Sequence, residues 1–407
     1  MSTSVHLNPA AKDWKYIPPN VLSSHTSPNL NPAQTFHDSL PDFQPTPIYN
    51  LESLARELKI GFLLLKHESG RFGLPSFKVL GATWAIYRTV CEHIGLSNHS
   101  GFLSHRENHE LPTLQNLCRY AGVDPQDYPN LKIITCTEGN WGRAVARMAS
   151  LMGIPTTVYV PGYMHPTTRA LIASEGSHGT ASVDVIPAGN YYDDAVEVAQ
   201  KQAEGDKDAL LVMDISWEGY EAIPQWVVEG YRTMLTEADA AISYLLNGKH
   251  PTHAIIPCGC GSVAQAVTQH YKATPPSPSS GRTKVLAVET NTAACLRASL
   301  QTGKMTAVPT SETIMNGMNC GTLSTTAWPV LQKGVDACVV VNDVEAHEAI
   351  QVLAREGINA GPCGAATLAA LKKVCEMQTE RTSLCLNEDS VVVLYCTEGL
   401  REYTPPV

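Results

Sequence analysis

The chain lacks the features that mark several large classes of protein. No apolar run approaches the roughly 20 residues that a membrane-spanning helix needs, so we expect no membrane partner. Basic residues form no long cluster and the net charge is −10, which argues against nucleic acid as a partner. Residues 1–8 show no basic start that leads into an apolar core, so we expect no secretory signal.

The cysteine pattern argues against a disulfide framework and against a metal site. The 12 cysteines mostly lie in apolar runs, as Cys338 does within Ala-Cys-Val-Val-Val. In a chain of 407 residues this indicates buried free thiols in a reducing compartment, which we take to be the cytoplasm. The one close pair, Cys258 and Cys260, lacks the two-residue spacer of a zinc knuckle, and the histidines show no ligand spacing. No metal site is predicted.

The chain does have a regular alternation of strand-like and helix-like segments. Residues 1–45, rich in Pro, Ser, Asn and His, are expected to form an irregular arm. Farther along, strands are predicted at 132–136 and 156–160, with a helix over 142–152 between them. Such alternation indicates βαβ units and a parallel sheet, so we predict an α/β fold. The length suggests about two domains, at roughly 100–200 residues each.

Lys78 is the first candidate for chemistry. It lies between Phe77 and Val79, and these apolar flanks predict a partly desolvated amine with a lowered pKa, which Schiff-base chemistry requires. The structural alternative is a lysine that extends its amine to water from the first turn of a helix capped by Ser76.

Three loops follow predicted strands, where open α/β sheets place their ligands. Residues 135–142 could hold an anion on backbone N–H groups, with Glu138 and Asn140 projecting into the same cavity. Residues 257–263, Pro-Cys-Gly-Cys-Gly-Ser-Val, are small enough for close approach of a phosphate. Residues 394–399 end the last strand, where a side chain could face a ring nitrogen. Each loop also has an ordinary structural interpretation, as a turn, a helix cap or a strand end.

Together, a buried lysine, a phosphate cup and an anion loop are what pyridoxal phosphate needs. The sequence resembles the fold-type II pyridoxal-phosphate enzymes, the tryptophan synthase β and threonine dehydratase group, and most closely the diaminopropionate ammonia-lyases. The resemblance rests on segments in the family's order, which are residues 68–78 (Glu-Ser-Gly-Arg-Phe-Gly-Leu-Pro-Ser-Phe-Lys), 137–143 (Thr-Glu-Gly-Asn-Trp-Gly-Arg), 192–194 (Tyr-Asp-Asp), 217–220 (Trp-Glu-Gly-Tyr), 223–226 (Ile-Pro-Gln-Trp), 259–262 (Gly-Cys-Gly-Ser) and 397–399 (Thr-Glu-Gly).

The resemblance implies two three-layer α/β domains with mainly parallel sheets and the cofactor in the cleft between them. The large, cofactor-binding domain would comprise residues 1–93, including the arm, and 236–407, and the small, substrate-binding domain residues 94–235. A homodimer is also implied. The implied cofactor residues are Lys78, which binds the aldehyde, Phe77 beside it, Asn140 at the phenolic oxygen, Gly259, Cys260, Gly261, Ser262 and Val263 at the phosphate, and Cys396 or Thr397 near the pyridine nitrogen. The implied substrate residues are Ser76, Thr137, Gly139, Trp141, Asp193 and Asp194.

The implied reaction is α,β-elimination of 2,3-diaminopropionate to pyruvate and ammonia. Lys78 takes the α-proton, and Glu138 stands where the family has an aspartate that acts as a second base on the D-substrate. Other departures from the family are Trp141, in place of a histidine, and Pro362-Cys363, which replace a carboxylate and a hydroxyl. They leave open a β-replacement, dehydratase or aldol-type enzyme, and a non-catalytic relative is a further alternative. Asp193 and Asp194 could equally be a solvated helix start, and residues 217–220 mainly packing.

Overall fold

A computed structural model describes residues 4–18, 31–96, 111–275 and 281–406. The chain forms two compact units, which we call unit 1 (Met1–Pro28, Pro45–Phe77 and Met234–Val407) and unit 2 (Asn29–Gln44 and Lys78–Thr233). Among the described residues, no helix is both long and apolar enough to cross a bilayer.

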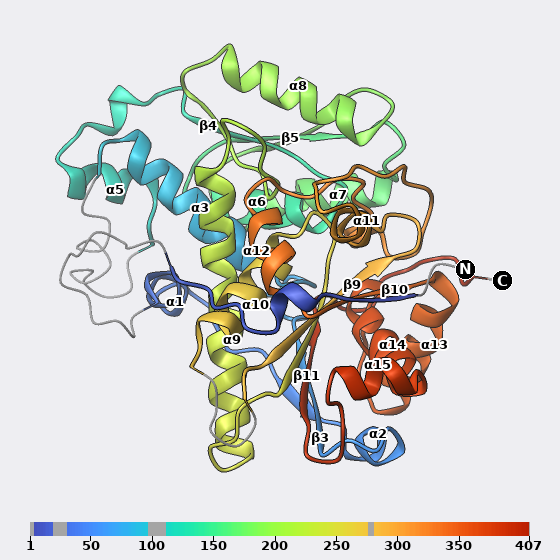
Figure 1. Cartoon of the computed structure of the whole chain (residues 1–407). Helices are drawn as coiled ribbons and strands as arrows, with labels where there is room; N and C mark the ends of the chain where they lie inside the picture. The colour runs from blue at the N-terminus through green and yellow to red at the C-terminus, as the bar shows by residue number, and fades with distance from the viewer. Residues whose placement is uncertain (1–3, 19–30, 97–110, 276–280, 407) are drawn as a thin grey trace. The chain divides into compact units, whose positions relative to one another are not determined.

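Unit 1 is built on a mainly parallel sheet with the strand order β1-β10-β9-β8-β11-β3-β2 (Figure 1). Only the edge strands β1 and β2 pair antiparallel with their neighbours. The interior strands are continuous apolar runs, as strands covered on both faces must be. Its strands are β1 (Val5–Leu7), β2 (Ile48–Asn50), β3 (Phe62–His67), β8 (His253–Pro257), β9 (Lys284–Thr290), β10 (Ala337–Val341) and β11 (Val391–Cys396).

The helices of unit 1 are mostly connections between these strands. They are η1 (Pro9–Ala11), α2 (Glu52–Glu57), α10 (Ser262–Ala273), α11 (Cys295–Thr302), η4 (Asn316–Met318), α12 (Trp328–Gly334), α13 (Asp343–Arg355), α14 (Pro362–Glu376) and α15 (Gln378–Ser383). Because β3, β8 and β11 are parallel neighbours, their carboxyl ends lie at one edge of the sheet. The loops that follow these three strands therefore meet there.

Unit 2 contains a smaller, wholly parallel sheet with the order β6-β5-β4-β7. Its strands are β4 (Lys132–Cys136), β5 (Thr156–Val160), β6 (Val183–Pro187) and β7 (Ala209–Leu211). Its helical segments are α1 (Pro32–Asp38), α3 (Lys78–His93), α5 (Leu114–Ala121), η2 (Pro125–Asp127), α6 (Asn140–Leu151), α7 (Pro166–Ser174), η3 (Glu175–His178), α8 (Tyr192–Glu204) and the first half of α9 (Ala222–Leu245). The strands predicted at 132–136 and 156–160 are confirmed.

The helices α3 and α9 approach each other within unit 2 at a pair of glycines. A Cβ atom at Gly81 would lie 2.6 Å from Cε1 of Tyr231 and 2.7 Å from Cγ1 of Val227. A Cβ atom at Gly230 would collide with the carbonyl oxygen of Leu80. Only glycine fits at either position, because no flexible side-chain end is available to move aside. The start of α3, which carries Lys78, is thereby fixed against α9.

The prediction that residues 1–45 form an irregular arm is wrong in two places. β1 pairs antiparallel with β10, with His6 opposite Cys338. The short helix α1 buries Phe36 and His37 in unit 2, and the His37 ring bonds to Thr233 Oγ1 at 2.8 Å and to the carbonyl oxygen of Leu80 at 3.0 Å. Both segments are too short for periodicity to reveal them, and their partners lie far along the chain.

The division into units differs from the predicted domain boundaries. Residues 78–93 and 29–44 belong to unit 2 rather than to the larger body. The reason is that α3 packs along α6 and α1 packs on α3, so both follow the smaller sheet. The roles predicted for the two domains, cofactor binding and substrate binding, remain predictions.

Candidate active site

The segment that leads to Lys78 is held in unit 1 by the end of the last strand. Ser76 forms an antiparallel bridge with Glu398, and the Phe77 N–H donates to the carbonyl oxygen of Thr397 at 3.3 Å. The Gly399 N–H donates to the carbonyl oxygen of Pro75 at 2.9 Å. Three of the predicted residues, Ser76, Phe77 and Thr397, are therefore brought together by backbone hydrogen bonds.

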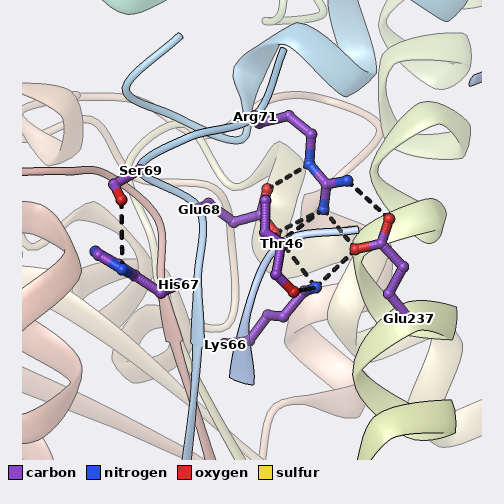
Figure 2. A network of polar contacts seen from close by, with 7 residues as sticks. All are labelled: Thr46, Lys66, His67, Glu68, Ser69, Arg71 and Glu237. Carbon is purple, nitrogen blue, oxygen red and sulfur yellow. Dashed lines mark hydrogen bonds and ion pairs between the residues drawn. The ribbon is translucent and has the colours of Figure 1, made fainter. Parts of the chain in front are cut away.

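The start of the same segment is anchored by a buried network of charged groups, which Figure 2 shows. The Arg71 guanidinium donates to both carboxylates, to Glu68 at 2.9 Å and to Glu237 at 2.6 and 2.7 Å. Lys66 donates to Glu237 at 2.6 Å and to the carbonyl oxygen of Thr46 at 2.7 Å. Burial alone would raise the pKa of Glu68, but the charge and hydrogen bonds of Arg71, with Lys66 and Thr46, lower it. The segment 68–77 therefore starts from a rigid anchor.

The loop between β8 and α10 is the predicted phosphate cup. Gly261 has a φ of 97°, which favours glycine, and a Cβ atom at Gly259 would lie 3.1 Å from the carbonyl oxygen of Gly317. Ser262 opens α10, whose first N–H groups have no acceptor within the helix. This turn contains all five predicted residues, Gly259, Cys260, Gly261, Ser262 and Val263. Small side chains and exposed helix N–H groups are what a phosphate requires.

Cys396 and Thr397 end β11 at the same edge of the sheet. Both are buried, and Cys396 Sγ lies 3.5 Å from the carbonyl oxygen of Glu398. Burial, with the nearby charge of Glu398, raises the pKa of the Cys396 thiol, so this group stays uncharged at neutral pH. Either residue offers a neutral neighbour to a ring nitrogen.

In unit 2, each strand of the parallel sheet is followed by a polar residue at its carboxyl end. Glu138 follows β4, Tyr163 follows β5, Asp193 follows β6 and Asp214 follows β7. The carboxylates among these side chains affect the pKa of the buried Cys136 thiol, which lies at the end of β4. Burial raises its pKa, and the charges of Glu138, Asp214 and Asp193 raise it further. The three carboxylates therefore lie within electrostatic range of this thiol.

Lys78, the first residue of α3, forms an ion pair with Asp214 within this unit. The two side chains are 22% and 10% exposed. The Lys78 Nζ also lies 6.0 Å from the centre of the Trp141 ring. The sequence predicted an amine made neutral by apolar flanks, whereas the structure gives it a carboxylate partner that favours the ammonium.

Glu138 accepts a hydrogen bond from the Tyr163 hydroxyl. The surrounding protein raises the pKa of Glu138 by desolvation and the charge of Asp193 adds to this, while the Tyr163 hydrogen bond and the charge of Lys78 act in the opposite direction. Because Glu138 remains exposed, water screens much of the effect. A carboxylate with a somewhat raised pKa, near an amine, is suited to proton transfer.

The structure gives several predicted substrate residues structural contacts. The Thr137 hydroxyl accepts the N–H groups of Gly139 at 2.9 Å and Gly142 at 3.0 Å, which shapes the loop. Trp141 is buried, and its Nε1 donates to Thr135 Oγ1 at 2.9 Å. Asn140 is the first residue of α6, next to Gly139.

The two aspartates at the start of α8 have different positions. Asp194 caps the helix, because its carboxylate accepts the N–H groups of Asn190 at 2.8 Å and Tyr191 at 2.9 Å. Asp193 is exposed and lies within electrostatic range of Glu138. Of the two predicted residues, Asp193 is the one with an electrostatic effect on Glu138.

Asp214 and Tyr163 were missed by the sequence analysis. Asp214 is positioned by Tyr220, whose hydroxyl donates to the Leu211 carbonyl oxygen at 2.8 Å and accepts the Met213 N–H at 3.0 Å. The Tyr220 ring stacks on Trp217, with 4.4 Å between ring centres. The signal that could have found both residues is their place just after a strand of a parallel sheet.

The fold and site define a class. A lysine at a helix start and a glycine turn that leaves little room for a Cβ atom fit pyridoxal phosphate, and so does an uncharged thiol at the end of β11. The model of the family described as "Pyridoxal-phosphate dependent enzyme" matches residues 40–397, so the chain belongs to that family, with pyridoxal 5′-phosphate as its cofactor and the fold-type II architecture.

Within this family, the chain is similar to diaminopropionate ammonia-lyases. It is 29% identical to that of Salmonella typhimurium over 376 residues, which cover 89% of this chain and 87% of the relative. It is 29% identical to that of Escherichia coli K12 over 393 residues, which cover 93% and 91%. A crystal structure of the Escherichia coli enzyme in complex with D-serine matches with a TM-score of 0.76 and 25% identity, over 97% of this chain and 93% of that one.

Proposed function

We propose that the chain is a pyridoxal-phosphate-dependent ammonia-lyase that eliminates ammonia from 2,3-diaminopropionate, giving pyruvate and ammonia. The observation that carries the proposal is that Lys78 stands among the side chains that follow four parallel strands, the Glu138 carboxylate included. The similarity to diaminopropionate ammonia-lyases over about nine-tenths of the chain supports the substrate class.

The cofactor residues proposed for this role belong to both units. Lys78 would bind the aldehyde, and the turn at 259–263 would hold the phosphate on the N–H groups at the start of α10. Asn140 would contact the phenolic oxygen, and Cys396 or Thr397 the pyridine nitrogen. When bound, the cofactor withdraws electrons from the amino acid attached to it and weakens the bond to the α-proton.

The protein's own groups would move that proton. The Lys78 amine takes the α-proton of the L-substrate. Glu138 takes it from the D-substrate, with its carboxylate oriented by Tyr163. The longer side chain of Glu138, compared with the aspartate of the family, displaces the carboxylate by about an ångström, and such a displacement can cost roughly 10²-fold in rate.

The substrate itself would be held by the start of α6 and by Asp193. The first N–H groups of α6, a 12-residue helix that begins at Asn140, suit an α-carboxylate. Thr137 shapes this loop through its two accepted hydrogen bonds, Trp141 closes one side, and Ser76 precedes the lysine segment. Asp193 is the proposed partner of the substrate's second ammonium.

The test is to record the absorption spectrum of the purified protein and then to add L- and D-2,3-diaminopropionate separately. We expect a band near the visible edge from the lysine-bound cofactor, and release of pyruvate and ammonia. Appearance of the band without release of pyruvate would support the cofactor assignment and contradict the proposed substrate.

A second candidate is elimination from a β-hydroxy amino acid, or β-replacement. It is favoured by residues 360–364, Ala-Gly-Pro-Cys-Gly, where the Cys363 N–H donates to Glu398 Oε1 at 3.0 Å. The loop is thus fixed by a carboxylate from elsewhere in the chain rather than by one of its own. L-serine and L-threonine in the same assay separate this candidate from the first.

The proposal extends to assembly and location. We propose that unit 1, the larger part, holds the cofactor's phosphate and pyridine nitrogen, and that unit 2 supplies Lys78 and Asn140 to the cofactor and most of the residues that bind the substrate. A homodimer is proposed from the family resemblance and is tested by light scattering of the purified protein. A cytoplasmic location is supported by the cysteines, since all 12 are free thiols in the structure.

A further inference from the structure

The ion pair between Lys78 and Asp214 is a contact for which the reaction as proposed has no use. Asp214 comes three residues after β7, and its side chain is 10% exposed. Such a carboxylate is costly to bury unless a cation or hydrogen bonds compensate it. The cation that the structure supplies is the same amine that is to bind the cofactor and take the α-proton.

The position of Asp214 is fixed by hydrogen bonds to the residues that precede it. The Tyr220 hydroxyl bridges Leu211 and Met213, on the three residues that precede Asp214. On the other side, the Thr135 hydroxyl donates to the Val212 carbonyl oxygen at 2.7 Å. The strand end that carries Asp214 is therefore fixed from both sides, by side chains that are themselves buried or stacked.

Titratable groups from several elements of unit 2 lie within electrostatic range of one member of the pair. They are Cys136 at the end of β4 and Tyr220 before α9, near Asp214, and Glu138 after β4, near Lys78. Tyr163 after β5 and Asp193 at the start of α8 lie within range of Glu138 in turn. Burial raises the pKa values of the Cys136 thiol and the Tyr220 phenol, so both are neutral near pH 7. Among these groups, Asp214 forms the ion pair with the amine, and Glu138 adds a second negative charge within electrostatic range of it.

We propose that Asp214 is the counterion that stabilises the ammonium form of Lys78, both in the protein without cofactor and after Lys78 has taken the α-proton. The inference rests on the proposed role of Lys78 and adds a second function to the pair. When Lys78 takes the α-proton, the C–H bond breaks, its electron pair stays with the substrate and an N–H bond forms on Nζ. Asp214 remains ionised and accepts a hydrogen bond from the new ammonium.

The same contact fixes where that proton goes next. The proton stays on Nζ, next to the reacting carbons. The substrate's β-ammonium carries away the bonding pair of the Cβ–N bond and leaves as ammonia without a further proton, so Lys78 remains an ammonium beside Asp214. Atoms and charges balance without another acid, and Asp214 is unchanged at the end.

The test uses cofactor uptake by the apo-protein, which requires neither the substrate nor turnover. Only the neutral amine attacks the aldehyde, so the rate of uptake, followed by absorbance, should rise with pH. In Asp214→Asn, we expect the pH of half-maximal uptake to fall by about one unit or more, because an opposite charge in contact typically shifts a titration by 1–3 units. Asp214→Glu, which keeps the charge, should have a pH of half-maximal uptake close to that of the wild type.

The controls make each outcome decisive. Asp193→Asn removes an exposed carboxylate of the same cluster and should shift the midpoint by less than half as much. An equal shift in Asp193→Asn, or no shift in Asp214→Asn, overturns the proposal. If Asp214→Asn fails to fold, the wild-type protein still decides, since uptake that is equally fast at pH 6 and pH 8 would mean that the amine is not held as an ammonium.

Failure of the proposed function gives a different result. Lys78→Ala should abolish the absorbance band, and a retained band would remove the basis of both proposals. A different outcome is that diaminopropionate is not consumed while the pH of half-maximal cofactor uptake still falls in Asp214→Asn. This would support Asp214 as the counterion and contradict the proposed substrate.

Discussion

The molecule contains two clusters of charged side chains, and they differ in balance and in access to water. The network in unit 1 pairs Lys66 and Arg71 with Glu68 and Glu237, two cations with two carboxylates, and none of these side chains is more than 6% exposed. In unit 2, Lys78 pairs with Asp214 and lies within electrostatic range of the exposed Glu138, whose carboxylate lies within range of the exposed Asp193 in turn.

This difference separates a structural use of charge from a chemical one. Arg71 donates to both carboxylates of its network, and these carboxylates neutralise its charge. The guanidinium is therefore not available to a ligand. Around Lys78 the negative charge exceeds the positive, and the proton on the amine can be exchanged with a substrate. A diamino acid carries one more ammonium than serine does, which matches the excess of carboxylates. Substitutions in one cluster or the other test this distinction.

The largest effect is expected for Lys78→Ala. Without the amine there is no group to bind the aldehyde or to take the α-proton, so turnover of either enantiomer should fall by about 10³-fold or more. Absorbance at the visible edge and pyruvate release measure this. Lys201→Ala, at an exposed lysine of the same unit, is the control and should behave as wild type.

Arg71→Met should damage stability rather than chemistry. It leaves two buried carboxylates without their shared cation, and removal of one partner from a buried ion pair typically costs 3–5 kcal/mol of unfolding free energy. Urea unfolding measures the loss. Asp214→Asn should cost less than about half as much, because the Lys78 side chain reaches water. Equal losses in the two variants would contradict the distinction between the clusters.

Glu138→Gln should separate the enantiomers. If Glu138 is the base for the D-substrate, kcat for that substrate falls by roughly 10²-fold or more, while kcat for the L-substrate changes by less than tenfold. Parallel assays with the two enantiomers give the ratio. A loss of the same size for both would reject a stereochemical role.

The smallest effect is expected for Tyr163→Phe. The phenol donates to the ionised carboxylate of Glu138 and lowers its pKa, so loss of the hydroxyl should raise that pKa further. A base must be deprotonated, so the acidic limb of D-substrate turnover should move to higher pH, by less than about one unit because the site is exposed. The pH profile of kcat measures this, and a move to lower pH would contradict the assignment.

The parts of the fold and site that were predicted correctly are those with local signatures. β4 and β5 alternate with helices of ordinary length, and the turn at 259–263 follows a strand and opens a helix, as its small residues predicted. These features depend on residues that lie next to one another, so the sequence alone contains them. The roles of this turn and of Lys78 in binding the cofactor remain predictions.

The parts that were missed depend on residues that are distant in sequence. Asp214 meets Lys78 across 136 positions, and nothing in the residues near Asp214 signals an amine partner. For the same reason β1 was not predicted, because its partner β10 lies more than 300 residues away. The neutral charge state predicted for Lys78 also depended on distant residues, because apolar neighbours in the chain do not show which side chains surround the amine in the fold.

The paired glycines at the approach of α3 and α9 have a consequence for how the site can change. Gly81 and Gly230 leave no room for a side chain, so the helix that begins with Lys78 has one permitted position against its neighbour. The close approach of the two helices therefore holds the backbone next to Lys78 independently of the loops after β4, β5 and β6. An exposed loop position such as 138 can be varied in directed evolution while α9 still holds that backbone.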